Sequence, residues 1–131
     1  MRCLLDTHAF LWWVLNDARL SSPAREVLRD AESEVFFSSA SAWEIAIKAR
    51  LGRSDIFEID GNPEELIPER IAANGFRVLP VDLRHALHVA ALPPLHGDPF
   101  DRLLVVQAQL EHLTLLTGDL AIARYGVPVI W

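Results

Sequence analysis

The stretch that decides the fold is residues 1–15, MRCLLDTHAFLWWVL. Residues 2–6 are expected to form a short buried strand, and residues 7–15 an apolar helix that follows it directly. Four further apolar segments also predict strands, at residues 34–38, 76–81, 113–117 and 127–130. Strands that alternate with helices predict right-handed crossovers and a mostly parallel sheet covered on both faces. The expected class is therefore α/β, a three-layer α/β/α sandwich with about five strands.

Capping signals mark the helices between these strands. Ser41-Ala42-Trp43-Glu44 has the form of a capping box, so one helix is expected to begin there and to end at Gly52. Pro68 lies inside the helix expected over residues 62–74 and is expected to kink or split it. The remaining helices are expected over residues 22–31, 82–91 and 98–112.

Length and composition predict one folded domain over residues 1–131. Hydrophobic residues make up 51% of the chain and charged residues 23%, which excludes a disordered protein. The single cysteine, Cys3, cannot form an internal disulfide, which is typical of the reducing cytoplasm. Asp6 and His8 interrupt the apolar N-terminus, so no signal peptide is expected. No run of about 18 uncharged apolar residues predicts a membrane span.

Four acidic residues are expected to meet at one edge of the sheet. Asp6 and Asp119 follow predicted strands, in LLDTH and LLTGD, while Glu44 and Asp101 lie near the starts of predicted helices. In open α/β sheets the ligand crevice lies beyond the carboxyl ends of the strands. Four carboxylates gathered there repel one another unless a hard divalent cation neutralises them, and such cations prefer oxygen ligands. The acids therefore predict a Mg²⁺ or Mn²⁺ site and phosphate chemistry.

Three of these acids also have a purely structural interpretation. Asp6 is suited to cap the helix that begins at Thr7. Glu44 is suited to complete the capping box, or to pair with Lys48 four residues later. Asp119 is suited to stabilise a turn after its strand. These alternatives stay open at the level of sequence.

The remaining site residues are divided between ligands and supporting groups. Asp98, directly before Pro99, is interpreted mainly as a helix cap, and Asp101, in the first turn of that helix, as the metal ligand. The Thr117 hydroxyl is expected to hold a neighbouring carboxylate or a metal-bound water. The five histidines are expected in core or surface roles, although His8 lies close enough to Asp6 in the chain to touch the site.

Five segments carry a resemblance to a known family. They are LLDTHAFLWW (4–13), SSASAWEIAIKARLGR (38–53), HGDPFDRLLVVQA (96–108), LLTGD (115–119) and YGVPVIW (125–131). In this order and over nearly the whole chain, they resemble the PIN-domain ribonucleases, in particular the VapC-type toxins of bacterial toxin–antitoxin pairs. The resemblance implies a PIN-like fold and a Mg²⁺- or Mn²⁺-dependent endoribonuclease. It assigns the three central acids to Asp6, Glu44 and Asp101, and the fourth to Asp119.

The same resemblance implies partners. A homodimer is expected, neutralised by a small antitoxin protein that obstructs the site. The net charge of −6 is unusual for an RNA-binding protein, because phosphates attract a basic surface. A bound divalent ion would convert the acidic patch into an attractive one. The basic residues expected to contact RNA are Lys48, Arg50, Arg53 and Arg102.

The expected reaction is metal-assisted hydrolysis of RNA phosphodiester bonds, with one or two metal ions. One alternative is a metal-dependent phosphatase or phosphotransferase with an aspartyl nucleophile, although His8 stands where many such enzymes have a second aspartate. A phosphoacceptor signalling domain is a further alternative, but it usually needs a lysine late in the chain, and Lys48 is the only lysine here. The last alternative is a PIN-like module that binds RNA or protein without catalysis.

Overall fold

The computed structural model of the protein describes residues 1–52 and 61–131, so the predicted RNA contact Arg53 lies outside the described residues. The strands form one parallel sheet in the order β3-β2-β1-β4-β5. They are β1 (Arg2–Leu5), β2 (Glu34–Ser38), β3 (Arg77–Leu79), β4 (Thr114–Leu116) and β5 (Val129–Ile130). The α-helices are α1 (Thr7–Val14), α2 (Ser22–Arg29), α3 (Ser39–Arg50), α4 (Pro63–Ala73), α5 (Leu83–His88), α6 (Pro99–Glu111) and α7 (Leu120–Ala123), and the 3₁₀ helix η1 (Val89–Ala91) follows α5.

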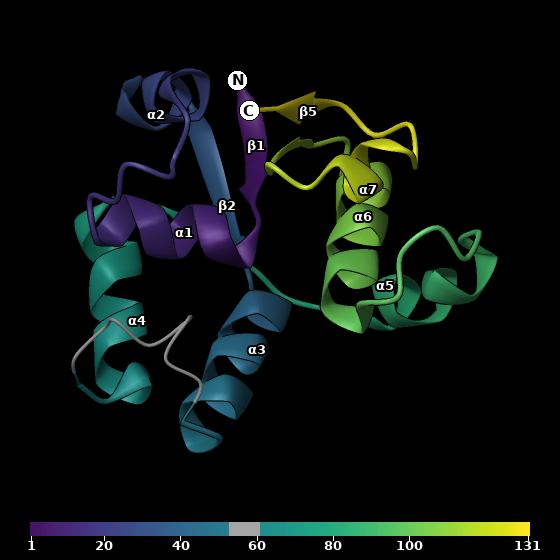
Figure 1. Ribbon diagram of the computed structural model, residues 1–131, viewed down its shortest axis with the longest axis horizontal. Coiled ribbons are helices and arrows are strands. Elements are labelled where there is room, and N and C mark those ends of the chain that lie inside the picture. Colours follow the sequence, from purple (N-terminus) through teal and green to yellow (C-terminus); the bar gives the residue numbers. More distant parts are fainter. Residues whose placement is uncertain (53–60) are drawn as a thin grey trace.

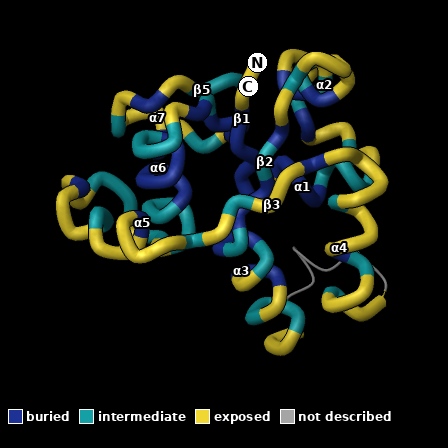
Figure 2. The backbone as a smooth tube through the Cα atoms, turned by 180° about the vertical axis from the view of Figure 1, so that it is seen from behind, coloured by how far each residue is buried: buried dark blue, intermediate teal, exposed yellow. Residues whose placement is uncertain are grey.

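Two hydrophobic cores lie on opposite faces of the sheet. Helices α1, α2 and α4 cover one face, and α5, α6 and α7 cover the other (Figure 1). One core includes Phe10 and Phe37, and the other includes Leu104 and Leu115. The central strands and the helices packed on them are the most buried parts of the backbone (Figure 2). The predicted three-layer α/β/α sandwich is confirmed.

The N-terminus of α3 differs from the prediction. The helix begins at Ser39, directly after β2, and its cap is Ser38, whose Oγ accepts a hydrogen bond from the Ala40 backbone N–H at 3.0 Å. Ser41 is buried inside the helix and Glu44 lies in its second turn. The predicted capping box is therefore wrong, because the last strand residue already supplies the capping hydroxyl.

Helix α4 also differs, because Pro68 neither kinks it into two elements nor ends it. Proline cannot donate the usual hydrogen bond to the carbonyl four residues earlier, which is that of Glu64. Both Glu64 and Pro68 are exposed, so water can reach that carbonyl. The helix tolerates this proline because the lost bond faces solvent.

Other boundaries move by a few residues. The strands predicted over residues 76–81 and 127–130 are shorter than expected, Arg77–Leu79 and Val129–Ile130. The short helix α7, which Asp119 caps, was not predicted. None of the helices in residues 1–52 and 61–131 combines the length and the apolar character that a membrane span needs.

A buried glutamine ties α6 to the edge of the sheet where the strands end. Gln107 has no exposed surface. Its Oε1 accepts a hydrogen bond from Ser38 Oγ at 2.5 Å, and its Nε2 donates to the Pro80 carbonyl at 3.2 Å. One side chain thus joins the end of β2, the segment before α5 and the middle of α6.

Gln107→Leu is expected to lower the free energy of unfolding by about 2–3 kcal/mol, because it leaves buried polar groups without partners. Urea denaturation measures this loss. Gln109→Leu is the matched control, since Gln109 lies on the same helix but is only half-buried. That change should stay within about 0.5 kcal/mol of the wild type. Equal losses in the two variants would contradict a bridging role for Gln107.

Candidate active site at the carboxyl ends of the strands

The acids predicted to act together lie at the edge where the parallel strands end. Asp6 follows β1 directly, and Asp119 follows β4 and caps α7. Glu44 comes from α3, which lies beyond the strand ends, and Asp101 comes from the first turn of α6 (Figure 1). Elements far apart in the chain therefore bring these carboxylates to one end of the sheet, where an α/β fold places its ligands.

Asp6 is held in a fixed, buried position. Its Oδ1 accepts a hydrogen bond from the Ala9 backbone N–H at 2.6 Å, so it does cap α1. Burial raises the pKa of Asp6, the Thr117 hydroxyl and the Ala9 N–H lower it, and the nearby charge of Glu44 raises it. Asp6 therefore acts as a cap and lies in the acidic group, and Thr117 supports it as predicted.

Glu44 is buried and both of its oxygens have partners. Thr7 Oγ1 donates to Oε1 at 2.5 Å, and Lys48 Nζ donates to Oε2 at 2.6 Å. The predicted pairing with Lys48 is therefore present. Burying a carboxylate without compensation is costly, and these two donors offset part of that cost. Lys48 is itself partly exposed, so its ammonium can turn toward solvent.

Asp101 shows most clearly that the acids are close together. Burial raises the pKa of Asp101 to about 7, and the negative charges of Asp98, Glu44 and Asp6 contribute to the rise, while His96 opposes it. Asp98 caps α6 by accepting hydrogen bonds from the backbone N–H groups of Phe100 at 2.8 Å and of Asp101 at 3.4 Å. The helix cap predicted for Asp98 is therefore present, and its charge adds to the acidic group.

His96 joins Asp119 to this group and was missed by the sequence analysis, which placed it in a core or surface role. Its Nε2 lies 2.8 Å from Asp119 Oδ2 and 3.3 Å from Asp101 Oδ2. Its Nδ1 accepts a hydrogen bond from the Asp98 backbone N–H at 3.0 Å, so in the neutral ring Nε2 carries the proton. Burial lowers the pKa of His96, but the bond to Asp119 and the charge of Asp101 outweigh it and raise the pKa.

This donor set suits a hard divalent cation. Carboxylates supply the oxygen ligands that such ions prefer, and burial, with a smaller contribution from neighbouring acids, raises the pKa of Asp6 and of Asp101. Ser41 adds a polar group, because its Oγ is buried and has no hydrogen-bond partner among the described residues. Ser41 and Glu44 are three residues apart on α3 and so share one helix face. An unpaired buried hydroxyl beside an acid fits a site that takes polar ligands.

Comparison with known proteins identifies the fold family. The PIN domain profile matches residues 3–128, which is nearly the whole chain. The chain belongs to the PIN domain family. The resemblance seen in the sequence is confirmed.

One relative of this PIN domain is a ribonuclease. Over 64 residues the chain is 36% identical to Ribonuclease VapC16 of Mycobacterium tuberculosis, an alignment that covers 49% of this chain and 43% of that protein. The match thus spans less than half of that relative's length.

Two solved structures share the fold at low sequence identity. One is VapBC2 from Rickettsia felis bound to a promoter DNA fragment, with a TM-score of 0.70, 14% identity and coverage of 99% and 98% of the two chains. The other is a toxin–antitoxin complex from Klebsiella pneumoniae, with a TM-score of 0.64, 20% identity and coverage of 98% and 96%.

Arg102 of this PIN domain supports the loop that carries His96. Its guanidinium donates to the Pro93 carbonyl at 3.0 Å and to the Tyr125 hydroxyl at 3.1 Å, with longer bonds to the carbonyls of Val89 and Leu92. The Tyr125 hydroxyl in turn accepts the His96 backbone N–H at 3.0 Å. Arg102 was predicted to contact RNA. In the structure its guanidinium donates hydrogen bonds to this loop and to Tyr125.

Gly118, between Thr117 and Asp119, allows a close approach inside the protein. A Cβ at this position would lie 2.7 Å from Cε2 of Trp131. The group that comes close is the Trp131 indole. The ring packs under the turn that presents Asp119.

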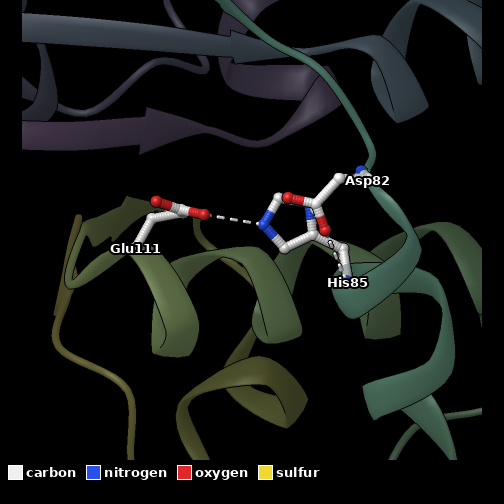
Figure 3. Close-up of side chains that lie close together, drawn as sticks. All are labelled: Asp82, His85 and Glu111. Atoms are coloured by element: carbon white, nitrogen blue, oxygen red, sulfur yellow. Dashed lines mark hydrogen bonds and ion pairs between the residues drawn. The ribbon is translucent and has the colours of Figure 1, made fainter.

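Asp82, His85 and Glu111 form a second cluster of possible ligands (Figure 3). Glu111 ends α6, whereas Asp101 lies in its first turn, so the cluster is at the other end of that helix. His85 Nδ1 accepts the Asp82 backbone N–H at 3.1 Å, and His85 Nε2 lies 2.9 Å from Glu111 Oε1. Asp82 Oδ1 lies 3.5 Å from His85 Nδ1, so the two carboxylates approach the two different ring nitrogens. Arg84 also pairs with Glu111 at 2.7 Å and with Asp82 at 3.5 Å. The cluster is a satisfied ion-pair network that caps α5 and joins it to α6.

Proposed function

We propose that this PIN domain is a divalent-metal-dependent endoribonuclease and the toxin of a toxin–antitoxin pair. The observation that carries the proposal is that ligand atoms of His96, Asp101 and Asp119 lie within 4.8 Å of one another. Burial, together with the charges of Asp98, Glu44 and Asp6, also raises the pKa of Asp101 to about 7. Carboxylates so crowded in a PIN domain favour a bound cation over a purely structural role.

The residues proposed to hold Mg²⁺ or Mn²⁺ are Asp6, Glu44, Asp101 and Asp119. When bound, such an ion lowers the pKa of a water molecule and stabilises charge on a phosphate group. Glu44 would exchange its bond to Lys48 for the ion, because both groups compete for the same carboxylate. Thr117 and Asp98 are proposed as supporting groups, since Thr117 bonds Asp6 and Asp98 fixes the first turn of α6.

The acids differ in exposure, and we propose that their roles differ accordingly. Ala9 and Thr117 fix Asp6, and Thr7 fixes one oxygen of Glu44, so these acids keep their orientation as substrate binds. Asp119 has the most exposed of the four acidic side chains, with 39% of its surface accessible. An acid in that position is suited to accept the proton of the attacking water.

The partners follow from the relatives. The fold neighbours include a VapBC structure and a toxin–antitoxin complex, so we propose that a small antitoxin protein neutralises this chain as well. We also propose a single PIN domain over residues 1–131, a homodimer, a cytoplasmic location and an RNA substrate. Of the basic residues expected to contact RNA, Lys48 and Arg50 lie on α3.

The deciding experiment measures cleavage of a labelled single-stranded RNA with Mg²⁺ or Mn²⁺ and with excess EDTA. We expect cleavage with metal, and at least a hundredfold loss with EDTA, because metal ions supply several kcal/mol of charge stabilisation. Excess Mn²⁺ should restore the activity. DNA of the same sequence controls for the nucleic-acid class. RNA binding without cleavage under all metal conditions would favour the non-catalytic PIN module instead.

A further inference from the structure

An aromatic pair, the exposed Trp43 and the half-buried Phe100, lies beside two of the acids. Trp43 immediately precedes Glu44 on α3, and Phe100 immediately precedes Asp101 on α6. Their ring centroids are 5.5 Å apart with an interplanar angle of 75°, an edge-to-face contact. Trp43 is 62% exposed although it contacts Phe100. The pair thus joins the two helices that present Glu44 and Asp101, and it leaves most of the indole open to solvent.

The indole continues into a shallow groove along α3. The groove has a volume of about 350 Å³ and is lined by Trp43, Ala46, Ile47, Arg50 and Leu51. These residues follow helical spacing and form one face of α3. Arg50 lies seven residues after Trp43, which is about 10 Å along the helix at a rise of 1.5 Å per residue. The groove therefore has an aromatic group next to the acids and an exposed cation at its other end.

The charge of the protein makes stacking important for binding. The net charge is −6. Of the described basic residues predicted to contact RNA, Lys48 pairs with Glu44 and Arg102 is held by the loop before α6. In the metal-free protein, attraction to phosphates is therefore weak near the site. Stacking of a base on an aromatic side chain contributes about 1–3 kcal/mol per base and does not depend on protein charge.

We propose that Trp43 stacks a nucleobase next to the scissile phosphate, and that single-stranded RNA runs from the acids along α3 toward Arg50. Phe100 holds the indole in place by its edge-to-face contact. Bases in a duplex are stacked on each other, so only an unpaired base is free to lie on Trp43. The substrate is therefore single-stranded or looped RNA. This inference rests on the proposed ribonuclease function and adds to it the group that binds the base.

The test compares wild type, Trp43→Ala, Trp43→Phe and Leu87→Ala in cleavage of a single-stranded RNA with Mn²⁺. Trp43→Ala should raise KM about 5- to 150-fold, the equivalent of 1–3 kcal/mol, with kcat changed less than about threefold. Trp43→Phe keeps an aromatic ring and should restore most of the affinity. Leu87 is 66% exposed on α5, so Leu87→Ala controls for the loss of an exposed apolar side chain.

Binding measured without cleavage gives a second readout. Fluorescence anisotropy of a labelled RNA should show weaker binding to Asp101→Asn/Trp43→Ala than to Asp101→Asn alone. The difference should disappear with an RNA that carries an abasic nucleotide at the stacking position. Both results support a base contact.

Three outcomes would overturn the inference. If wild type cleaves RNA and Trp43→Ala keeps its KM and affinity, the base contact is wrong and the ribonuclease function stands. If wild type neither binds nor cleaves RNA, the proposed function itself fails. If Trp43→Ala changes only the oligomeric state in sedimentation or only the binding of a protein partner, Trp43 belongs to a protein interface.

Discussion

Asp101→Asn is expected to lower the rate of RNA cleavage by about a thousandfold or more without disrupting the fold. The substitution keeps the shape of the side chain but removes the charge of a proposed metal ligand. A metal site supplies several kcal/mol of charge stabilisation, and each 1.4 kcal/mol changes the rate tenfold. Single-turnover cleavage of a labelled RNA with Mn²⁺ measures the loss. Circular dichroism checks that the helical content is unchanged.

The same substitution should stabilise the metal-free protein. The pKa of Asp101 is raised from 3.8 to about 7, so the folded state binds this proton more tightly than the unfolded state does. The contribution of Asp101 to stability therefore falls as pH rises from about 4 to about 7, and it is least favourable above that range. Asparagine stays neutral. Urea denaturation with EDTA at pH 8 should show a gain of roughly 1–3 kcal/mol, since one pKa unit corresponds to about 1.4 kcal/mol.

Asp17→Asn is the matched control for both effects. Hydrogen bonds from Arg19 lower the pKa of Asp17 to about 2, the opposite direction from Asp101. Asp17 lies after α1 and outside the acidic group, so its substitution should leave cleavage unchanged and should not increase stability. Full cleavage activity in Asp101→Asn would remove Asp101 from the proposed site. A stability loss in metal-free Asp101→Asn would contradict the repulsion between the acids.

Most of the fold follows from patterns that are local in the sequence. Apolar runs such as residues 34–38 and 113–117 predict buried parallel strands, because both faces of the sheet are covered. Boundaries depend on which of several suitable residues supplies a cap. Ser38 and Ser41 both fit the N-terminus of α3, and the contact of Ser38 with Gln107, 69 residues away, is not visible in a local pattern.

The site residues also divide into those that local patterns predict and those that long-range contacts position. Asp6 and Asp119 were predictable because they follow strands, and Asp101 because its helix has a clear Asp-Pro start. His96 was not, because its position depends on a loop. Arg102 and Tyr125 fix that loop through long-range hydrogen bonds, which put the imidazole between two acids. Periodicity and capping rules describe helices and strands, and they contain no rule for such a loop.

Phe10→Ala is expected to lower the free energy of unfolding by about 3–5 kcal/mol, the usual cost of removing a buried aromatic ring. Phe10 is fully buried, and its ring centroid lies 4.3 Å from that of Phe37 and 6.4 Å from that of Phe76. It therefore joins α1 to β2 and to the segment before β3. Urea denaturation measures the loss, with Leu87→Ala as the exposed control expected to stay within about 0.5 kcal/mol.

The stability that Phe10 contributes helps to offset the free-energy cost of burying the acids. Burying Asp6 and Glu44 costs free energy, and Asp6 is also the cap of the helix that Phe10 anchors. The hydrophobic core under α1 offsets that cost, so Phe10→Ala should bring the metal-free protein close to unfolding, given typical stabilities of about 5–15 kcal/mol. Phe10→Leu keeps most of the volume and should cost less than about 1.5 kcal/mol. A loss in Phe10→Leu equal to that in Phe10→Ala would contradict this expectation, because it would show that the aromatic ring, and not the buried apolar volume, holds α1 in place.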